Sequence, residues 1–101
     1  MKTLGTHNYY VYILTNKNKT VLYTGVTNNL RDRLFWHKNS SECSTHFTAK
    51  YKCYYLIYFE QFTSIETAIN REKQIKGWKR IKKEDLINSF NSTWNFLNDE
   101  V

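Results

Sequence analysis

The sequence predicts a small α+β fold, in which a mainly antiparallel three-stranded sheet is flanked by helices. Three runs rich in β-branched and aromatic residues have the composition of strands, and segments of helical period lie between and after them. The chain of 101 residues shows no repeat, linker or low-complexity tract, so we expect one domain with a core over about residues 9–97. The predicted order of elements is β-β-α-β-α-α.

The first two strands are expected to form a hairpin. Tyr9–Thr15 (YYVYILT) and Thr20–Val26 (TVLYTGV) are strand-like, and the polar residues between them are typical of a turn. In an antiparallel hairpin the numbers of opposed residues have a constant sum, so a turn centred after residue 17 places Tyr12 opposite Tyr23. Both rings then lie on one face of the sheet. Taken alone, such a pair stabilises a hairpin more often than it performs chemistry, and a longer loop would break the opposition.

A first helix should follow the hairpin, with Thr27 or Asn28 as its cap. Four residues recur at helical spacing along it: Leu30, Arg33, Leu34 and His37. A guanidinium can hold a phosphate and an imidazole can move a proton near neutral pH, so Arg33 and His37 are candidates for chemistry. The alternative is a partly exposed basic face. Residues 38–49 indicate a polar loop with a short helical turn.

The third strand and the later helices complete the pattern. Cys53–Phe59 (CYYLIYF) is the most strand-like run in the chain. Thr63 and Glu66 have the spacing of a capping box, which predicts a second helix that ends near Lys76, before Gly77. A third helix is expected over roughly Lys82–Phe90, and the apolar residues of the tail Trp94–Leu97 should dock on the body.

One carboxylate interrupts the apolar stripe of the second helix. The stripe consists of Ile65, Ala68, Ile69 and Ile75. Glu72 lies at its next position, three residues after Ile69, and a carboxylate there needs a partner that offsets desolvation. A metal ion or a buried arginine would serve, and so would a structural ion pair or an edge position that reaches water.

Charge indicates a polyanionic partner. The net charge is +6, and seven of the fifteen basic residues lie between residues 71 and 83 around Trp78. Clustered lysines and arginines suit contacts to a phosphate backbone, although a charge run is more often a solvated face. The predicted nucleic-acid-binding residues are Arg71, Lys73, Lys76, Lys79, Arg80, Lys82 and Lys83.

Other classes of protein find little support in the sequence. No apolar run has the length of a signal peptide or a membrane span, so a cytoplasmic location is expected. Cys43 and Cys53 form no CxxC pair, which favours two reduced thiols. A metal site that joins them to His37 and His46 would match no known ligand spacing.

These residues together resemble the GIY-YIG nuclease superfamily, in particular its small single-domain bacterial branch, which is related to the endonuclease domain of UvrC-type repair enzymes. Residues 10–12 (YVY) and 23–25 (YTG) match the two halves of its signature, and Arg33 and His37 follow Tyr23 at the family's spacing. Residues 68–78 (AINREKQIKGW) are similar to its acidic helix. The resemblance covers Tyr9 to Leu97. It departs from the signature at Tyr10, in place of glycine, and at Thr24, in place of isoleucine.

The resemblance implies a DNA endonuclease that hydrolyses phosphodiester bonds with one Mg²⁺ or Mn²⁺ ion, directed by DNA structure or weakly by sequence. It implies that Glu72 holds the metal, that Arg33 neutralises the phosphoryl oxygens, and that Tyr12 or Tyr23 orients or deprotonates water. His37 would accept a proton or set the ionisation of the tyrosine. Homologous domains also occur in homing and restriction endonucleases, so the resemblance leaves open whether the process is DNA repair.

Two alternatives belong to other classes. A binding module that keeps the fold and the basic face would bind DNA or RNA without cutting it and would need mainly the lysines. A regulatory domain whose tyrosines only pack would show no salt-dependent affinity for nucleic acid. Asn91 and Asn95 compete for the asparagine that some family members place near the C-terminus. The sequence does not indicate an oligomeric state.

Overall fold

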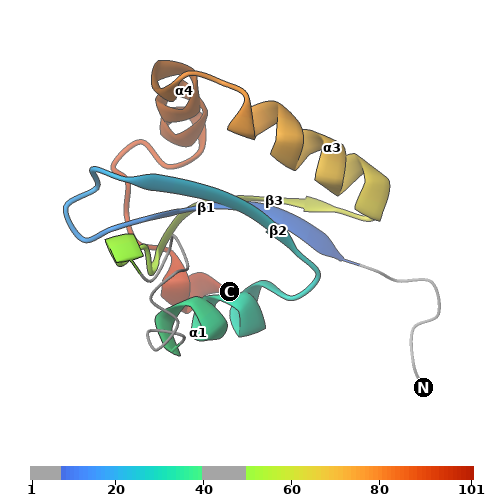
Figure 1. Ribbon diagram of the computed structural model, residues 1–101, viewed down its shortest axis with the longest axis horizontal. Coiled ribbons are helices and arrows are strands. Elements are labelled where there is room, and N and C mark those ends of the chain that lie inside the picture. The colour runs from blue at the N-terminus through green and yellow to red at the C-terminus, as the bar shows by residue number, and fades with distance from the viewer. Residues whose placement is uncertain (1–7, 40–49) are drawn as a thin grey trace.

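A computed structural model describes residues 8–39 and 50–101 as an α+β fold with one three-stranded antiparallel sheet of strand order β2-β1-β3 (Figure 1). The predicted fold class and order of elements are confirmed. The elements are β1 (Tyr9–Thr15), β2 (Leu22–Thr27), α1 (Leu30–Asn39), β3 (Tyr55–Phe62), α3 (Ile65–Lys76), α4 (Arg80–Phe90) and a short 3-10 helix η1 (Asn98–Glu100). None of the described helices has the length and apolar character needed to cross a membrane.

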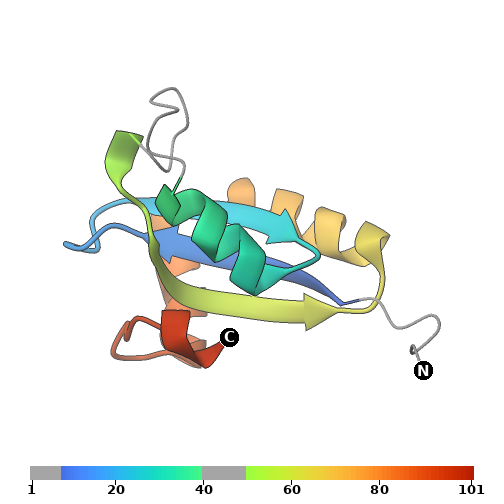
Figure 2. The same ribbon diagram turned by 90° about the horizontal axis from the view of Figure 1, so that it is seen from below.

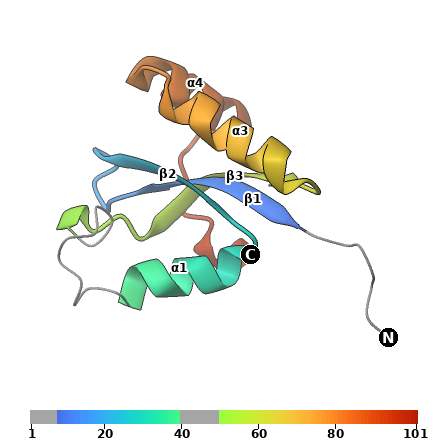
Figure 3. The ribbon, with the colours of Figure 1, turned by 45° about the vertical axis from the view of Figure 1, so that its right-hand side comes forward.

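The sheet separates two layers of helices. Helices α3 and α4 cover one face, and α1 lies across the other (Figures 1 and 3). Alternate residues of β1 therefore enter two different cores. Val11 and Ile13 pack with Ile75 of α3 and Ile87 of α4. Tyr12 and Leu14 pack with Leu30 and Leu34 of α1 on the other face.

The hairpin register differs from the prediction by two residues. Tyr12 lies opposite Gly25, and Tyr23 lies opposite Leu14. The predicted opposition of the two tyrosines is wrong because the turn is longer than assumed: Asn16 accepts hydrogen bonds from the backbone N–H groups of Thr20 and Val21, and β2 begins only at Leu22. A shift of two residues preserves the face, so both tyrosine rings still project toward α1.

The helix boundaries also differ from the sequence pattern. Asn29 caps α1, since its side chain accepts from the backbone N–H of Asp32, so neither Thr27 nor Asn28 is the cap. Ser64, rather than the Thr63 of the predicted capping box, accepts from Thr67 at the start of α3. One residue is enough to change a cap, because the cap is set by where the chain leaves the preceding strand.

The remaining boundaries move by a few residues. The third strand is Tyr55–Phe62 instead of Cys53–Phe59, and α4 begins at Arg80 instead of Lys82. Gly77 ends α3 as predicted. Helix α1 continues through Asn39, which shortens the predicted loop, and the residues 40–49 of that loop lie outside the described part of the chain.

The tail docks on the sheet, as predicted. The backbone N–H of Leu97 donates to the carbonyl of Leu56 at 2.7 Å, and the Leu97 side chain is buried on the α1 side. The tail and η1 thus lie beside β3 (Figure 2). Trp94 packs against the other core, so the tail closes the β3 edge for both layers.

Candidate active site

Tyr12 is the centre of the candidate active site. It lies in the middle of the central strand β1, and its side chain is buried, with 1% exposure. The hydroxyl of Tyr12 and Nε2 of His37 are joined by a hydrogen bond of 2.9 Å. His37 comes from α1 and is 2% exposed, so the strand and the helix hold this bond away from water.

Gly25 leaves the space that the phenol of Tyr12 occupies. A Cβ at Gly25 would lie 2.5 Å from the Tyr12 hydroxyl oxygen and 2.6 Å from Cζ, well inside any ordinary contact. The ring of Tyr12 therefore extends across the neighbouring strand, toward β2, through the space that the missing side chain leaves. The second half of the signature needs glycine here for close approach rather than for an unusual backbone conformation.

Tyr23 completes an aromatic group around His37. The centroid of its ring lies 6.4 Å from that of Tyr12 and 5.5 Å from that of His37. Tyr23 is half-buried, whereas Tyr12 is not accessible. The two tyrosines are diagonal neighbours on the sheet, which is why the rings meet although the residues do not oppose each other.

Two charged groups act on Tyr12 from different helices. Burial is the largest cause that raises the pKa of the Tyr12 phenol far above its ordinary value of 10.0. The neighbouring Tyr23 raises this pKa further, Arg33 of α1 lowers it and Glu72 of α3 raises it. The tyrosines, the guanidinium and the carboxylate thus lie close enough to interact, and Tyr12 is a neutral phenol at neutral pH.

Glu72 reaches this group from the opposite layer of the fold. Helices α1 and α3 approach each other beside β2, where Arg33 and the isoleucines Ile65 and Ile69 line one hollow of about 240 Å³. Glu72 follows Ile69 by three residues, on the same side of α3. Ile65 is 49% exposed, so the predicted buried stripe fails at its first position and forms a border of this hollow instead.

The carboxylate of Glu72 is partnered. Its side chain is 12% exposed, and its Oε2 lies 2.6 Å from Nζ of Lys76, one turn further along α3. Within residues 8–39 and 50–101, no three His, Cys, Asp or Glu side chains gather as metal ligands. One carboxylate nevertheless fits Mg²⁺, which in proteins usually keeps several waters and takes its other ligands from substrate phosphates. The Lys76 side chain is 52% exposed, so it has room to leave the carboxylate.

Trp36 belongs to the site and was not predicted. The guanidinium of Arg33 lies over its ring at 5.3 Å, and its ring meets that of His37 edge to face at 5.0 Å. The tryptophan, which is 40% exposed, thus contacts both side chains. Its position three residues after Arg33, directly before His37, was the available signal.

The predicted nucleic-acid-binding residues fall into two groups. Arg71 makes an ion pair with Glu60 at 2.9 Å, and Arg80 makes one with Glu84 at 2.9 Å, so these two arginines have acidic partners within the chain. The exposed lysines are Lys73, Lys76, Lys79 and Lys82, and Lys83 is half-buried. Lys82 and Arg71 both lie over the ring of Trp78, which is partly buried against the core.

Asn91 has a structural place. Its amide nitrogen donates to the carbonyls of Ile57 and Asn95, and its oxygen accepts from the Asn95 backbone. The bond to Ile57 ties the tail to β3, and the two bonds with Asn95 close the turn after α4. Of the other possible metal ligands, Cys53 is a buried free thiol, and the remaining Cys43 and His46 lie outside the described residues.

Comparison with known proteins agrees with this geometry. The profile of the GIY-YIG catalytic domain matches residues 8–85. The chain belongs to the GIY-YIG family. The matched part includes every residue of the candidate site: Tyr12, Gly25, Arg33, His37 and Glu72. The part of the chain that defines the family is therefore the part that surrounds the buried phenol.

Small proteins of this family resemble the chain along most of their length. A UPF0213 protein of Clostridium perfringens is 42% identical over 80 residues, which are 79% of this chain and 83% of the relative. One from Syntrophus aciditrophicus is 40% identical over 78 residues, 77% of this chain and 87% of the relative. The solution structure of a UPF0213 protein from Bacillus halodurans has a TM-score of 0.54 and 32% identity, covering 83% of this chain and 86% of its own.

Proposed function

We propose that this GIY-YIG chain is a metal-dependent endonuclease that hydrolyses phosphodiester bonds in DNA. The observation that carries the proposal is the hydrogen bond of 2.9 Å between Tyr12 and His37, around which Tyr23, Arg33 and Glu72 gather. A base, a cation and a carboxylate beside aromatic hydroxyls are the groups that attack at phosphorus requires.

Burial divides the work between the two tyrosines. Tyr12 is not accessible to a substrate, and its raised pKa keeps the phenol neutral, so its part is to position His37 through the hydrogen bond to Nε2. Tyr23 is half-buried beside the same imidazole and is the tyrosine that can meet the attacking water. His37 can then take the proton that the water releases, with the Tyr23 hydroxyl as the relay.

The charged residues act on the phosphate. Arg33, held over the ring of Trp36, presents a guanidinium that neutralises charge developing on the phosphoryl oxygens. Glu72 would hold the divalent metal once Lys76 has moved from its carboxylate. When bound, such an ion polarises the scissile phosphate and stabilises the departing oxygen.

The exposed lysines provide affinity without sequence preference. Lys73, Lys76 and Lys79 follow one another along the end of α3 and the turn after it, close to Glu72 in the chain. Contacts from lysine to phosphate are electrostatic and weaken with salt, which fits recognition of DNA by shape rather than by bases. Arg71 and Arg80 would add to this surface with less effect, because Glu60 and Glu84 offset part of their charge.

The test is cleavage of labelled branched, nicked and plain duplexes with Mg²⁺ or Mn²⁺, beside the variants Glu72→Gln and Lys76→Gln. We expect Glu72→Gln to lose cleavage by about 100-fold or more while it keeps DNA binding, because the neutral amide removes one metal ligand and leaves all the lysines in place. Lys76→Gln removes the competitor for the carboxylate and should lower the metal concentration needed. Equal cleavage by Glu72→Gln and the wild type would contradict the proposal.

The second candidate is a binding module that does not cut. It is favoured by one observation, the ion pair between Glu72 and Lys76, which satisfies the carboxylate without a metal. Salt-dependent binding of DNA or RNA, with no cleavage of any substrate in either metal, would support this function instead.

A further inference from the structure

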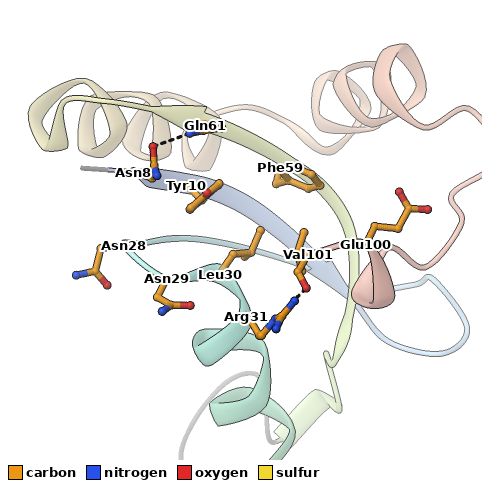
Figure 4. Close-up of a pocket in the computed structure, with 10 residues that line it drawn as sticks. All are labelled: Asn8, Tyr10, Asn28, Asn29, Leu30, Arg31, Phe59, Gln61, Glu100 and Val101. Atoms are coloured by element: carbon orange, nitrogen blue, oxygen red, sulfur yellow. Dashed lines mark hydrogen bonds between the residues drawn. The ribbon is translucent and has the colours of Figure 1, made fainter. Parts of the chain in front are cut away.

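A hollow of about 440 Å³ lies on the α1 side of the sheet, next to the candidate active site (Figure 4). Aromatic and amide side chains dominate its lining: Tyr10, Phe59, Asn8, Gln61, Asn28 and Asn29. Its size is within the range of roughly 300–1,000 Å³ that is usual for sites that bind small ligands. The proposed mechanism uses none of these side chains.

The floor of the hollow is aromatic and adjoins Tyr12. Tyr10 lies two residues before Tyr12 on the same face of β1, and Phe59 is the partner of Tyr12 across the pairing of β1 with β3. The two floor rings meet edge to face, with centroids 6.5 Å apart. Both are half-buried, so each ring is held in place and still open to a ligand.

The walls of the hollow offer hydrogen bonds. Nε2 of Gln61 donates to Oδ1 of Asn8 at 2.6 Å, which orients both amides at the mouth, as Figure 4 shows. Asn28 and Asn29 stand on the opposite side, at the start of α1. Asn29 keeps its amide N–H donors although its oxygen caps α1, and Asn28 offers both donors and an acceptor, the groups that can pair with the edge of a nucleobase.

The charges on the walls do not suit a phosphate. The lining contains one basic residue, Arg31, whose Nε donates to the backbone carbonyl of Val101 at 3.1 Å. It also contains the carboxylate of Glu100, which would repel an anion. A flat, neutral group with a hydrogen-bonding edge fits this lining better than a phosphate does.

The hollow is continuous with the site. Asn28 and Asn29 also line a second hollow, of about 380 Å³, whose other residues include Arg33 and Trp36. A strand whose phosphate lies at Arg33 would therefore pass the start of α1 before its next bases reach Tyr10 and Phe59.

We propose that this hollow binds an unpaired base of the substrate between Tyr10 and Phe59, with its face on one ring and its edge toward the other, so that the chain acts on DNA in which unpaired nucleotides adjoin a duplex. The inference rests on the proposed function and names the substrate class for the same site. Stacking of a base on an aromatic side chain tolerates any sequence, which matches a protein that reads DNA structure.

The experiment measures binding in EDTA, where no cutting occurs, by fluorescence anisotropy. One duplex carries a short single-stranded overhang, and its matched partner carries the same overhang with abasic nucleotides, which keep the phosphates and remove the bases. We expect the wild type to prefer the overhang with bases by about fivefold or more. Tyr10→Ala and Phe59→Leu should lose this preference, and Phe35→Leu, at an α1 residue that is 70% exposed and outside the hollow, should keep it.

Equal affinity of the wild type for the two overhangs would overturn the inference, and this comparison does not depend on the folding of any variant. Thermal melting identifies a variant that has lost its fold, and a folded Phe59→Leu that keeps the preference would also overturn it. Cleavage in Mg²⁺ is scored separately. A base preference without cleavage would reject the nuclease and keep the base site. Cleavage without the preference would keep the nuclease and reject the base site.

Discussion

Replacing Gly25 by alanine tests how the candidate site is held together. The new Cβ would lie 2.5 Å from the Tyr12 hydroxyl oxygen, and ordinary contact begins near 3.4 Å, so the ring must retreat by roughly 1 Å. The buried ring has no open space to enter, and its hydrogen bond of 2.9 Å to His37 would be stretched beyond bonding distance.

The expected magnitude follows from these two effects. Overpacking of a filled core costs about 1–3 kcal/mol and a lost hydrogen bond about 1 kcal/mol, so Gly25→Ala should lower the free energy of unfolding by about 2–4 kcal/mol. A displacement of about 1 Å in a catalytic group should also lower cleavage by about 100-fold. Urea unfolding followed by circular dichroism, and cleavage measured well below the unfolding midpoint, report the two effects separately.

Gly77→Ala is the matched control. A Cβ at Gly77 would meet only the carbonyls of Gln74 and Lys73, both at 3.6 Å, and the backbone there is right-handed helical with φ of −78°. We expect stability equal to the wild type or higher by up to about 1 kcal/mol, because alanine restricts the unfolded chain. If Gly25→Ala behaved like Gly77→Ala, the close approach of Tyr12 to β2 would not organise the site, and our reasoning would be refuted.

Three further predictions concern stability, pH and salt. Asn91→Ala should lower the free energy of unfolding by about 1–3 kcal/mol, since it breaks the bonds to β3 and the tail, yet leave cleavage per folded molecule unchanged. Burial raises the pKa of the Cys53 thiol from 9.0 to about 11, and burial, then Glu60, raise the pKa of Tyr58 above 10.0. Both neutral forms favour the folded state, so stability should be full below pH 9 and fall above it, and Cys53→Ala should flatten the loss between pH 9 and 11 in urea titrations. Lys73→Ala should reduce the slope of log affinity against log salt by about 1, which anisotropy at several salt concentrations would measure.

The fold was predictable because its signals are local. Runs such as Tyr9–Thr15 carry β-branched and aromatic residues at strand spacing, and Gly77 ends its helix where the pattern indicated. The hairpin register was not predictable in this way, because it depends on the side chain of Asn16. That side chain holds a longer turn than the polar composition alone suggests. Because the register shifted by two residues, each side chain stays on its predicted face of the sheet, and Tyr12 and Tyr23 still share one face.

The site was predictable only in part. Arg33 and His37 are one helical turn apart, so their proximity is a local property. The approach of Glu72 to these residues is not a local property. Helix α3 lies on the other face of the sheet, and the distance between the two layers depends on how the whole core packs. Helical spacing singled out Glu72 on its own helix, and the resemblance to the family joined it to Arg33 and His37. The resemblance did not supply Trp36, which lies outside the quoted motifs.

The strand order has a consequence for how the molecule is made. β1 leaves the ribosome first, yet it is the central strand, and its second partner is β3, at Tyr55–Phe62. The hairpin can pair early, but α3 with Glu72 follows later still, and Leu97 must be synthesised before the tail bonds to β3. A nascent chain therefore holds Tyr12 and His37 well before it holds the carboxylate. The groups that meet at the phenol therefore come together only after α3 has been synthesised and has packed on the sheet.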